Sequence, residues 1–136
     1  MTDRPDEGDK DLQAILRRWV RWLRAGGSAL SASLAAAYEE RVGREQDGYR
    51  DPVAEFVDLR IAKLTRFHRR LIVRTWYGEE AQEAMGKDLG LSRHGVRVHL
   101  IRAEAELSGA IRAITGQAPT ERDLEAWVSR QVISAS

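Results

Sequence analysis

Apolar residues near the start of the chain recur every three or four positions, which places them on one face of an α-helix. The sequence therefore predicts a helix over residues 11–24, capped by Asp9 or Asp11 and ended by Gly26-Gly27. The apolar face consists of Leu12, Ile15, Leu16, Trp19, Val20 and Leu23. A long connection over residues 25–50 follows.

Two further helices are predicted within residues 51–77. Asp51-Pro52 is typical of a helix start, because aspartate caps the first turn and proline fits its first position. Thr65 is placed to cap the second of these helices, from Arg66 to Tyr77. The residues expected to be buried are Val53, Phe56, Val57, Leu59, Ile61, Leu64, Leu71, Ile72 and Trp76.

A short helix, a tight turn and a long helix are predicted within residues 80–115. The short helix covers residues 80–88, and Gly90 takes the left-handed conformation of the turn. Ser92 caps the long helix, which ends at Gly116. The inward-facing residues of the two helices are Ala84, Met85, Leu89, Val96, Leu100, Ala103, Leu107, Ile111 and Ile114.

A final helix is predicted over residues 120–133, with Thr120 as its cap and Leu124, Trp127 and Val128 packed on the body. No stretch shows the sustained alternation of a strand. The expected fold class is therefore all-α, a helical bundle. We expect a single helical domain over residues 11–136, after a disordered acidic segment over residues 1–10.

Composition limits the kinds of site and the cellular location that are expected for the protein. The 136 residues include no cysteine, so disulfides and thiolate metal sites are excluded. The chain has no apolar run of about 18 residues that would span a membrane. The acidic N-terminus is unlike a secretory signal, and a cytoplasmic location is expected.

Charge is distributed unevenly along the chain. The net charge is +1 overall but +6 over residues 60–102, which also hold all three histidines. Such a block indicates a surface for a polyanion, and chance clustering on solvated helices is the alternative. Between Ser92 and Ala103 the chain carries no acid.

The helix, glycine turn and capped helix of residues 80–115 have the spacing of a helix-turn-helix. In that motif the amino end of the second helix enters the major groove of DNA, and its flanks meet phosphates. Residues expected to face the bases are Arg93, His94, Arg97 and Val98. His99 and Arg102 follow one to two turns later, where the backbone approaches.

This region resembles region 4 of bacterial sigma-70 factors. The stretch "YGEEAQEAMGKDLGLSRHGVRVHLIRAEAEL" matches that pattern at Leu89, Gly90, Ser92, Val96, Arg97, Leu100, Arg102, Ala103 and Leu107. It departs from the pattern at Met85-Gly86, where Ile-Ala is usual, and at Gly95. The resemblance covers about residues 66–108.

A second resemblance involves the N-terminal helix. "LRRWVRW", residues 16–22, is similar to the opening of phage antitermination proteins of the Q type. A connection, two helices and a helix-turn-helix follow in the order usual for those proteins, over most of residues 12–110. The zinc-bearing version of that family is ruled out, because the chain has no cysteine.

The resemblance implies a transcription regulator that binds double-stranded DNA near a late promoter. It would engage a sigma-containing RNA polymerase and carry it through terminators. In this interpretation Lys87, together with His99 and Arg102, holds the DNA backbone. A sigma-like activator that acts only at initiation is the first alternative, and an interaction adaptor without DNA binding is the second.

A polymerase contact is expected to need a surface away from the DNA. Trp22 with Arg18 and Arg21 is the candidate, because Trp22 lies off the apolar stripe, and exposed aromatic residues among cations suit protein contacts. Burial of Trp22 in a second layer of the core is the alternative.

Catalysis and metal binding are not expected. His94 and His99 are five residues apart, which separates them on a helix, whereas helical ligand pairs are usually four apart. No nucleophile–base arrangement and no phosphate-binding glycine loop is apparent. The sequence therefore predicts neither an enzyme nor a cofactor or metal site.

Overall fold

The computed structural model describes residues 9–26 and 50–135, without the side chains of residues 132–135. Over these residues the secondary structure is entirely helical, and the all-α prediction is confirmed. The elements are α1 (Lys10–Arg24), α3 (Pro52–Ala62), α4 (Arg66–Ile72), the π-helix η2 (Val73–Tyr77), α5 (Gln82–Leu89), α6 (Arg93–Thr115) and α7 (Glu121–Ala135). Apart from Asp9 and Lys10, the predicted disordered segment lies outside the described residues, as does most of the connection over 25–50.

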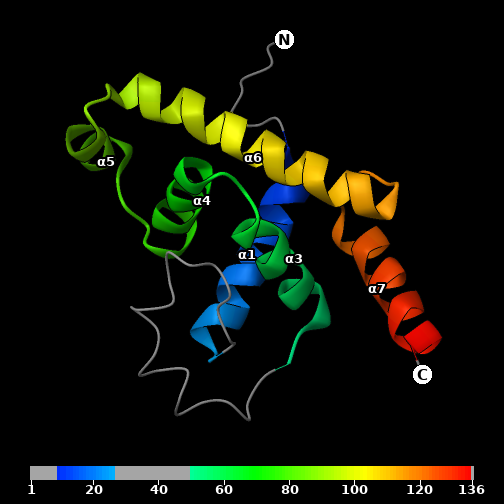
Figure 1. Ribbon diagram of the computed structural model, residues 1–136. Coiled ribbons are helices and arrows are strands. Elements are labelled where there is room, and N and C mark those ends of the chain that lie inside the picture. The colour runs from blue at the N-terminus through cyan, green and yellow to red at the C-terminus, as the bar shows by residue number, and fades with distance from the viewer. Residues whose placement is uncertain (1–8, 27–49, 136) are drawn as a thin grey trace.

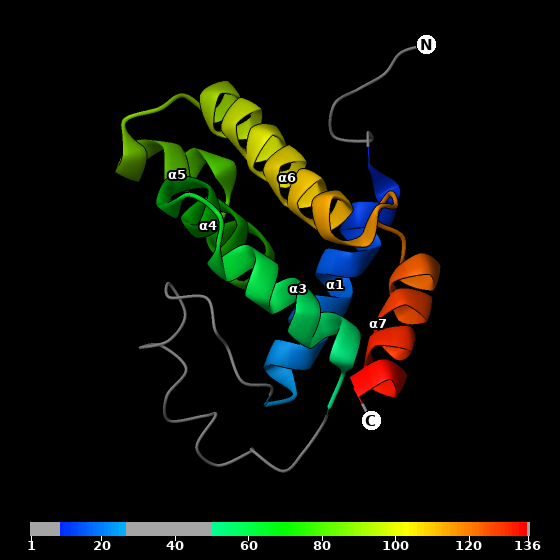
Figure 2. The ribbon, with the colours of Figure 1, turned by 45° about the vertical axis from the view of Figure 1, so that its right-hand side comes forward.

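The helices are arranged around α1 and along α6. Figure 1 shows α6 along one side of the molecule, with α5 at its N-terminal end and α7 turning back from its C-terminal end. Contacts from α3, η2 and α7 partly enclose α1, and α4 packs against α6 (Figure 2). The buried side chains of these helices form one hydrophobic core.

The apolar face of α1 is wider than the pattern predicts. The predicted stripe is buried except for Val20, which is half-buried, and Trp22 is only 2% exposed. Trp22 belongs to the core because α3, η2 and α7 cover α1 from several sides. The expectation that Trp22 is exposed is therefore wrong, and the alternative of burial is confirmed.

A buried hydrogen bond joins α1 to α3. The indole Nε1 of Trp19 donates to Oδ1 of Asp58 over 2.9 Å, and neither residue is exposed to solvent. A buried indole N–H needs an acceptor, which accounts for a carboxylate in the core. Asp58 thus faces inward, and the prediction that Leu59 is buried is wrong, because its side chain is exposed.

The helix predicted from Arg66 to Tyr77 changes type in its middle. After Ile72 it continues as the π-helix η2, in which the amide of Gly78 donates to the carbonyl of Val73 over 3.0 Å. Gly78 is required here, because a Cβ would lie 2.8 Å from the carbonyl oxygen of Arg74. Trp76 is half-buried rather than fully buried, and its Nε1 donates to Glu104 of α6 over 3.0 Å.

Most predicted helix ends are confirmed. Asp9 accepts from the amide of Leu12, and Thr120 accepts from the amide of Asp123. Thr65 does not cap α4 with its own side chain; its hydroxyl donates to Glu106 of α6. Two of the residues predicted to be buried in α5 and α6 are exposed, namely Ala84 and Ile114.

The position of α7 explains the exposure of Ile114. Ile114 continues the apolar stripe of α6. However, α7 packs on α3 and α1 rather than beneath the last turn of α6, so this residue is not covered. Ala84 is exposed because the inner face of α5 is formed by Met85 and Gly86.

We expect Trp22→Ala to lower the free energy of unfolding by about 3–5 kcal/mol, because it leaves a cavity in the core. Urea denaturation followed by circular dichroism measures this loss. Leu59→Ala is the control, since truncation of an exposed side chain changes stability by about 0.5 kcal/mol or less. An unchanged midpoint for Trp22→Ala would contradict the core position of this residue.

Candidate nucleic-acid interface

A tight turn joins α5 to α6. Gly90 has φ of 74°, the left-handed conformation expected from the sequence, and its amide donates to the carbonyl of Gly86. The amide of Leu91 donates to the same carbonyl over 2.8 Å. Ser92 then begins α6 by accepting from the amide of Gly95 over 2.9 Å, as predicted. These contacts fix the direction in which α6 leaves the turn.

The close approach in this turn depends on Gly86. A Cβ at this position would lie 2.5 Å from the carbonyl oxygen of Leu91, so any side chain would force the backbone apart. The glycine at this position therefore has a structural reason.

The inner side of the α5–α6 pair is apolar. Met85 of α5 and Val96 of α6 have no exposed surface, and Leu100 is also buried. Burial of these residues fixes the rotation of α6 about its axis. The opposite side of the N-terminal half of α6 therefore faces solvent.

The predicted contact residues lie on the solvent side and the flanks of α6, with one on α5. Arg93, His94 and Arg102 are exposed, and Arg97 and Val98 are half-buried. They all lie in the first three turns of α6. Lys87 is exposed in the last turn of α5, beside the turn that leads to α6.

His99 lies on one flank of α6 rather than on its outer face. Its ring meets the ring of Phe67 edge to face, with 5.2 Å between centroids. This contact joins α6 to α4, and His99 is half-buried as a result. The sequence alone gave no sign of the contact, because the two residues lie on helices whose crossing could not be foreseen.

The cations of this surface have no acidic partners. Within residues 9–26 and 50–135, the arginines that form ion pairs are Arg18, Arg24, Arg50 and Arg74. No ion pair in this part of the chain involves the predicted contact residues Lys87, Arg93, His94, Arg97, His99 and Arg102. The outer side of the N-terminal half of α6 is therefore positively charged, and none of its charged side chains is neutralised by an ion pair among the described residues.

Three acids near α6 are engaged with other groups. Asp88 binds Nη1 of Arg74 over 2.9 Å, and Glu104 accepts from the indole of Trp76. Glu106 is paired with Nδ1 of His68 and also accepts from Thr65. These contacts hold the carboxylates beside α4 and η2, which leaves the cations of the outer side free to bind an anion.

Burial raises the pKa of Glu104 above its ordinary value, and the hydrogen bond from Trp76 opposes this change. Desolvation has the larger effect because it disfavours the charged carboxylate. A nearby negative charge on Asp9 raises the pKa further. The folded protein thus binds a proton at Glu104 more tightly than the unfolded chain does.

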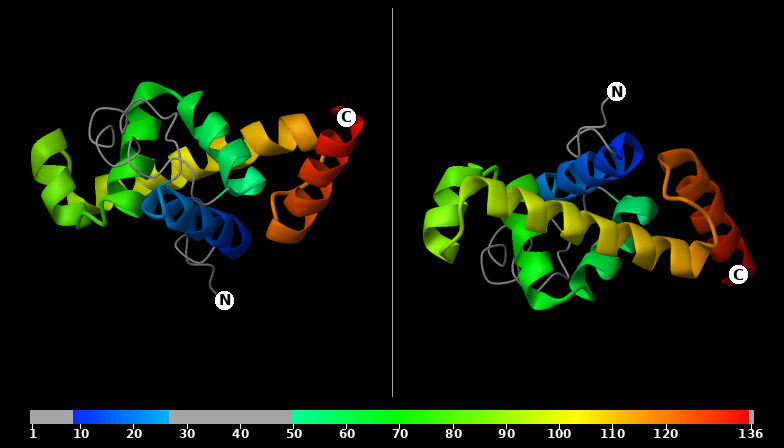
Figure 3. Two further views of the ribbon diagram at one scale, coloured as in Figure 1. Left: turned by 90° about the horizontal axis from the view of Figure 1, so that it is seen from below. Right: turned by 90° about the horizontal axis from the view of Figure 1, so that it is seen from above.

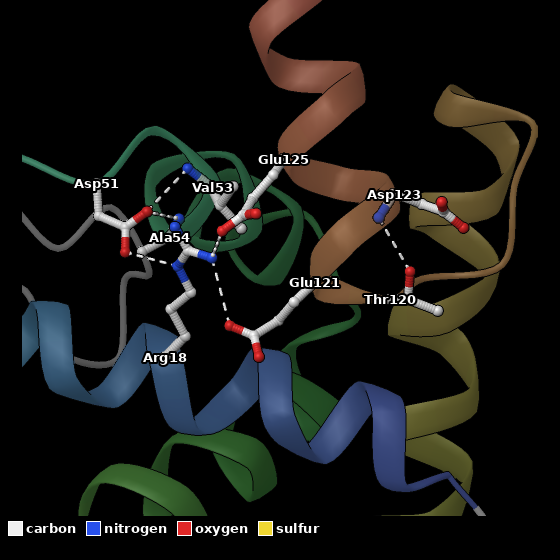
Figure 4. A network of polar contacts seen from close by, with 8 residues as sticks. All are labelled: Arg18, Asp51, Val53, Ala54, Thr120, Glu121, Asp123 and Glu125. Atoms are coloured by element: carbon white, nitrogen blue, oxygen red, sulfur yellow. Dashed lines mark hydrogen bonds and ion pairs between the residues drawn. The ribbon is translucent and has the colours of Figure 1, made fainter.

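Arg18, one of the residues expected to contact polymerase, is engaged within the fold (Figure 4). Its Nε binds Asp51 over 2.8 Å, and its Nη1 binds Glu125 over 2.6 Å and Glu121 over 3.3 Å. The hydrogen bond with Asp51 is the main cause that raises the pKa of Arg18. The prediction that Arg18 is free to contact a partner is wrong.

The predicted polymerase surface is therefore not assembled. Trp22 is in the core and Arg18 binds three carboxylates, while Arg21 alone of the three is exposed. The amphipathic pattern did not reveal this outcome, because the acids that bind Arg18 lie 33 to 107 residues away in the sequence.

Comparisons with protein-family models, curated proteins and solved structures found no match to this chain. None of the described helices is long and apolar enough to cross a membrane. Over the same residues, no group of three or more histidine or acidic side chains is placed to hold a metal ion.

We expect Glu104→Gln to make the protein more stable than the parent at pH 7. Because the pKa of Glu104 is raised in the folded protein, protonated Glu104 stabilises the fold relative to the unfolded chain at pH values below the ordinary pKa of glutamate. This stabilisation is lost as the pH rises through the raised pKa. Glutamine keeps an acceptor for Trp76 and never ionises. The advantage of the variant should disappear toward about pH 4, near the ordinary pKa of glutamate.

Thermal denaturation between pH 3.5 and 8 measures this difference. Glu83→Gln, at an exposed position on α5, is the control for loss of a negative charge. A stability difference that stays constant over the whole pH range would contradict the assignment.

Proposed function

We propose that this protein is a DNA-binding transcription regulator, in which α5 and α6 act as a helix-turn-helix. The observation that carries the proposal is the set of cations without acidic partners on the outer side of the N-terminal half of α6. A major groove about 12 Å wide admits one α-helix, and guanine offers two acceptors there to an arginine. Arg93 and Arg97 are the residues that we assign to the bases, together with His94 and Val98.

The flanks of the same helix supply the contacts to phosphates. Arg102 and Lys87 are exposed cations at either side of the base-reading turns. His99, which is held against Phe67, lies toward one strand of the duplex. Phosphate contacts of this kind fix orientation, whereas contacts to base edges give specificity.

We further propose that the regulator acts as an antiterminator, loading on a paused RNA polymerase and promoting read-through. Support for this step comes from the resemblance of the chain to Q-type phage proteins. The N-terminal Trp helix is part of that resemblance, but burial of Trp22 makes its role structural. The polymerase contact is therefore assigned to none of the residues of that helix.

Duplex binding tests the first proposal. A preferred site is selected from a random library of duplexes, and affinity is then measured by fluorescence anisotropy. We expect Arg97→Ala to weaken binding to that site by about 1–3 kcal/mol and to relax the preference at one base position. The melting temperature should change little, because the side chain is not in the core.

Arg112→Ala is the matched control, since it removes an exposed arginine near the far end of the same helix. Its affinity should equal that of the parent within error. Unchanged affinity for Arg97→Ala, or equal losses for both variants, would contradict the assignment of the N-terminal half of α6 to DNA.

Transcription in vitro tests the second proposal. The template carries the selected site beside a promoter and a terminator downstream. We expect the parent protein to increase the fraction of transcripts that pass the terminator several-fold, and Arg97→Ala to lose this effect. More transcripts with an unchanged read-through fraction would indicate an activator of initiation, and duplex binding without any effect on transcription would reject a regulator of this polymerase.

A further inference from the structure

A stretch of the chain next to α6 carries cations and no acids. From Leu59 to Gly78 there are six lysine and arginine residues and no aspartate or glutamate. Three of the six are engaged within the fold. Arg60 lies over the ring of Phe56, Arg69 donates to the carbonyl of Ala62, and Arg74 binds Glu80 and Asp88.

The other three are Lys63, Arg66 and Arg70, and all are exposed. No ion pair involves them in the part of the chain that the structure describes. Arg66 and Arg70 are four residues apart on α4, so their side chains lie on the same side of that helix. Lys63 lies just before them, at the end of α3. We call these three residues the α4 ridge.

Contacts place the start of α4 beside one flank of α6. Phe67 meets His99, and His68 binds Glu106 over 2.5 Å. Thr65 also donates to Glu106 through its hydroxyl. In the view from above (Figure 3, right), the turn between α3 and α4 projects to one side of α6. His99 therefore lies on the flank of α6 that faces the start of α4.

We propose that the α4 ridge binds the phosphates of the DNA strand that borders the groove entered by α6. This inference rests on the function proposed above. Packed helices have axes about 8–10 Å apart. With α6 in a groove about 12 Å wide, a helix that packs against the flank of α6 lies near the edge of the groove, where the phosphates are. His99 and Arg102 connect this surface to the base-reading turns.

The double variant Arg66→Ala, Arg70→Ala tests the proposal by anisotropy over a range of salt concentrations. Each lost phosphate contact reduces the slope of log affinity against log salt by about 0.9, so we expect a decrease of nearly 2. Affinity should fall roughly tenfold at moderate salt, equally for the selected duplex and for random duplexes, because phosphates carry no sequence information.

The control is Arg17→Ala, Arg21→Ala, which removes two exposed arginines with the same spacing from α1. We expect it to leave the slope unchanged. Equal slopes for the α4 variant and the parent would overturn the inference, as would equal effects of the two double variants. If the α4 variant lost affinity for single-stranded DNA only, the inference would also be overturned, in favour of a single-strand site.

The outcomes separate this inference from the proposed function. If Arg97→Ala weakens duplex binding and the α4 variant does not, only the α4 ridge is rejected. If the parent protein does not bind duplex DNA, both are rejected. Melting temperatures of the variants show that each retains its fold, which we expect because all four substituted arginines are exposed.

Discussion

The contact between Arg18 and Asp51 is the interaction on which the relative positions of three helices depend. Asp51 begins α3 by accepting from the amides of Val53 and Ala54, and it is almost fully buried there. A carboxylate removed from water needs a counter-charge, because an unpaired buried charge is strongly destabilising. Arg18 of α1 provides it, and the same guanidinium holds Glu121 and Glu125 near the start of α7.

This arrangement has consequences for the opposite side of the molecule. Fixing α3 also fixes the short turn into α4, and α4 packs against α6. The position of α6 relative to the rest of the protein is therefore set by a chain of contacts that begins at Arg18. Asp51, Glu121 and Glu125 are bound by Arg18, and Glu80 and Asp88 by Arg74, which keeps these carboxylates apart from the cations of α6.

Local signals predicted much of this fold. The stripes of α1 and α6, the left-handed Gly90, the end of α6 at Gly116 and the Asp51 cap depend on residues within one or two turns of each other. The core position of Trp22 was harder to predict, because it depends on how many helices surround α1. The inward position of Asp58 follows from a partner 39 residues away, Trp19.

The sequence predicted the charged residues of the candidate surface but not the contacts between helices that complete it. Its cations stand close together in the sequence, and the absence of acids among them is visible there. What the sequence did not reveal is the contact of His99 with Phe67, which adds α4 to the surface. Nor did it reveal that Arg18 is bound by carboxylates from α3 and α7, because no local pattern relates such distant charges.

The π-helix η2 sets the rotation, about the helix axis, of the residues that follow α4. An α-helix advances by about 100° for each residue, so a turn that holds one additional residue rotates everything after it by that angle. Trp76 reaches Glu104 in this rotated register, and α5 begins soon afterwards. Loss of a single residue between Val73 and Tyr77 would restore an α-helix and take Trp76 out of the register in which it reaches Glu104. The number of residues in this segment therefore decides which of its side chains meet α6.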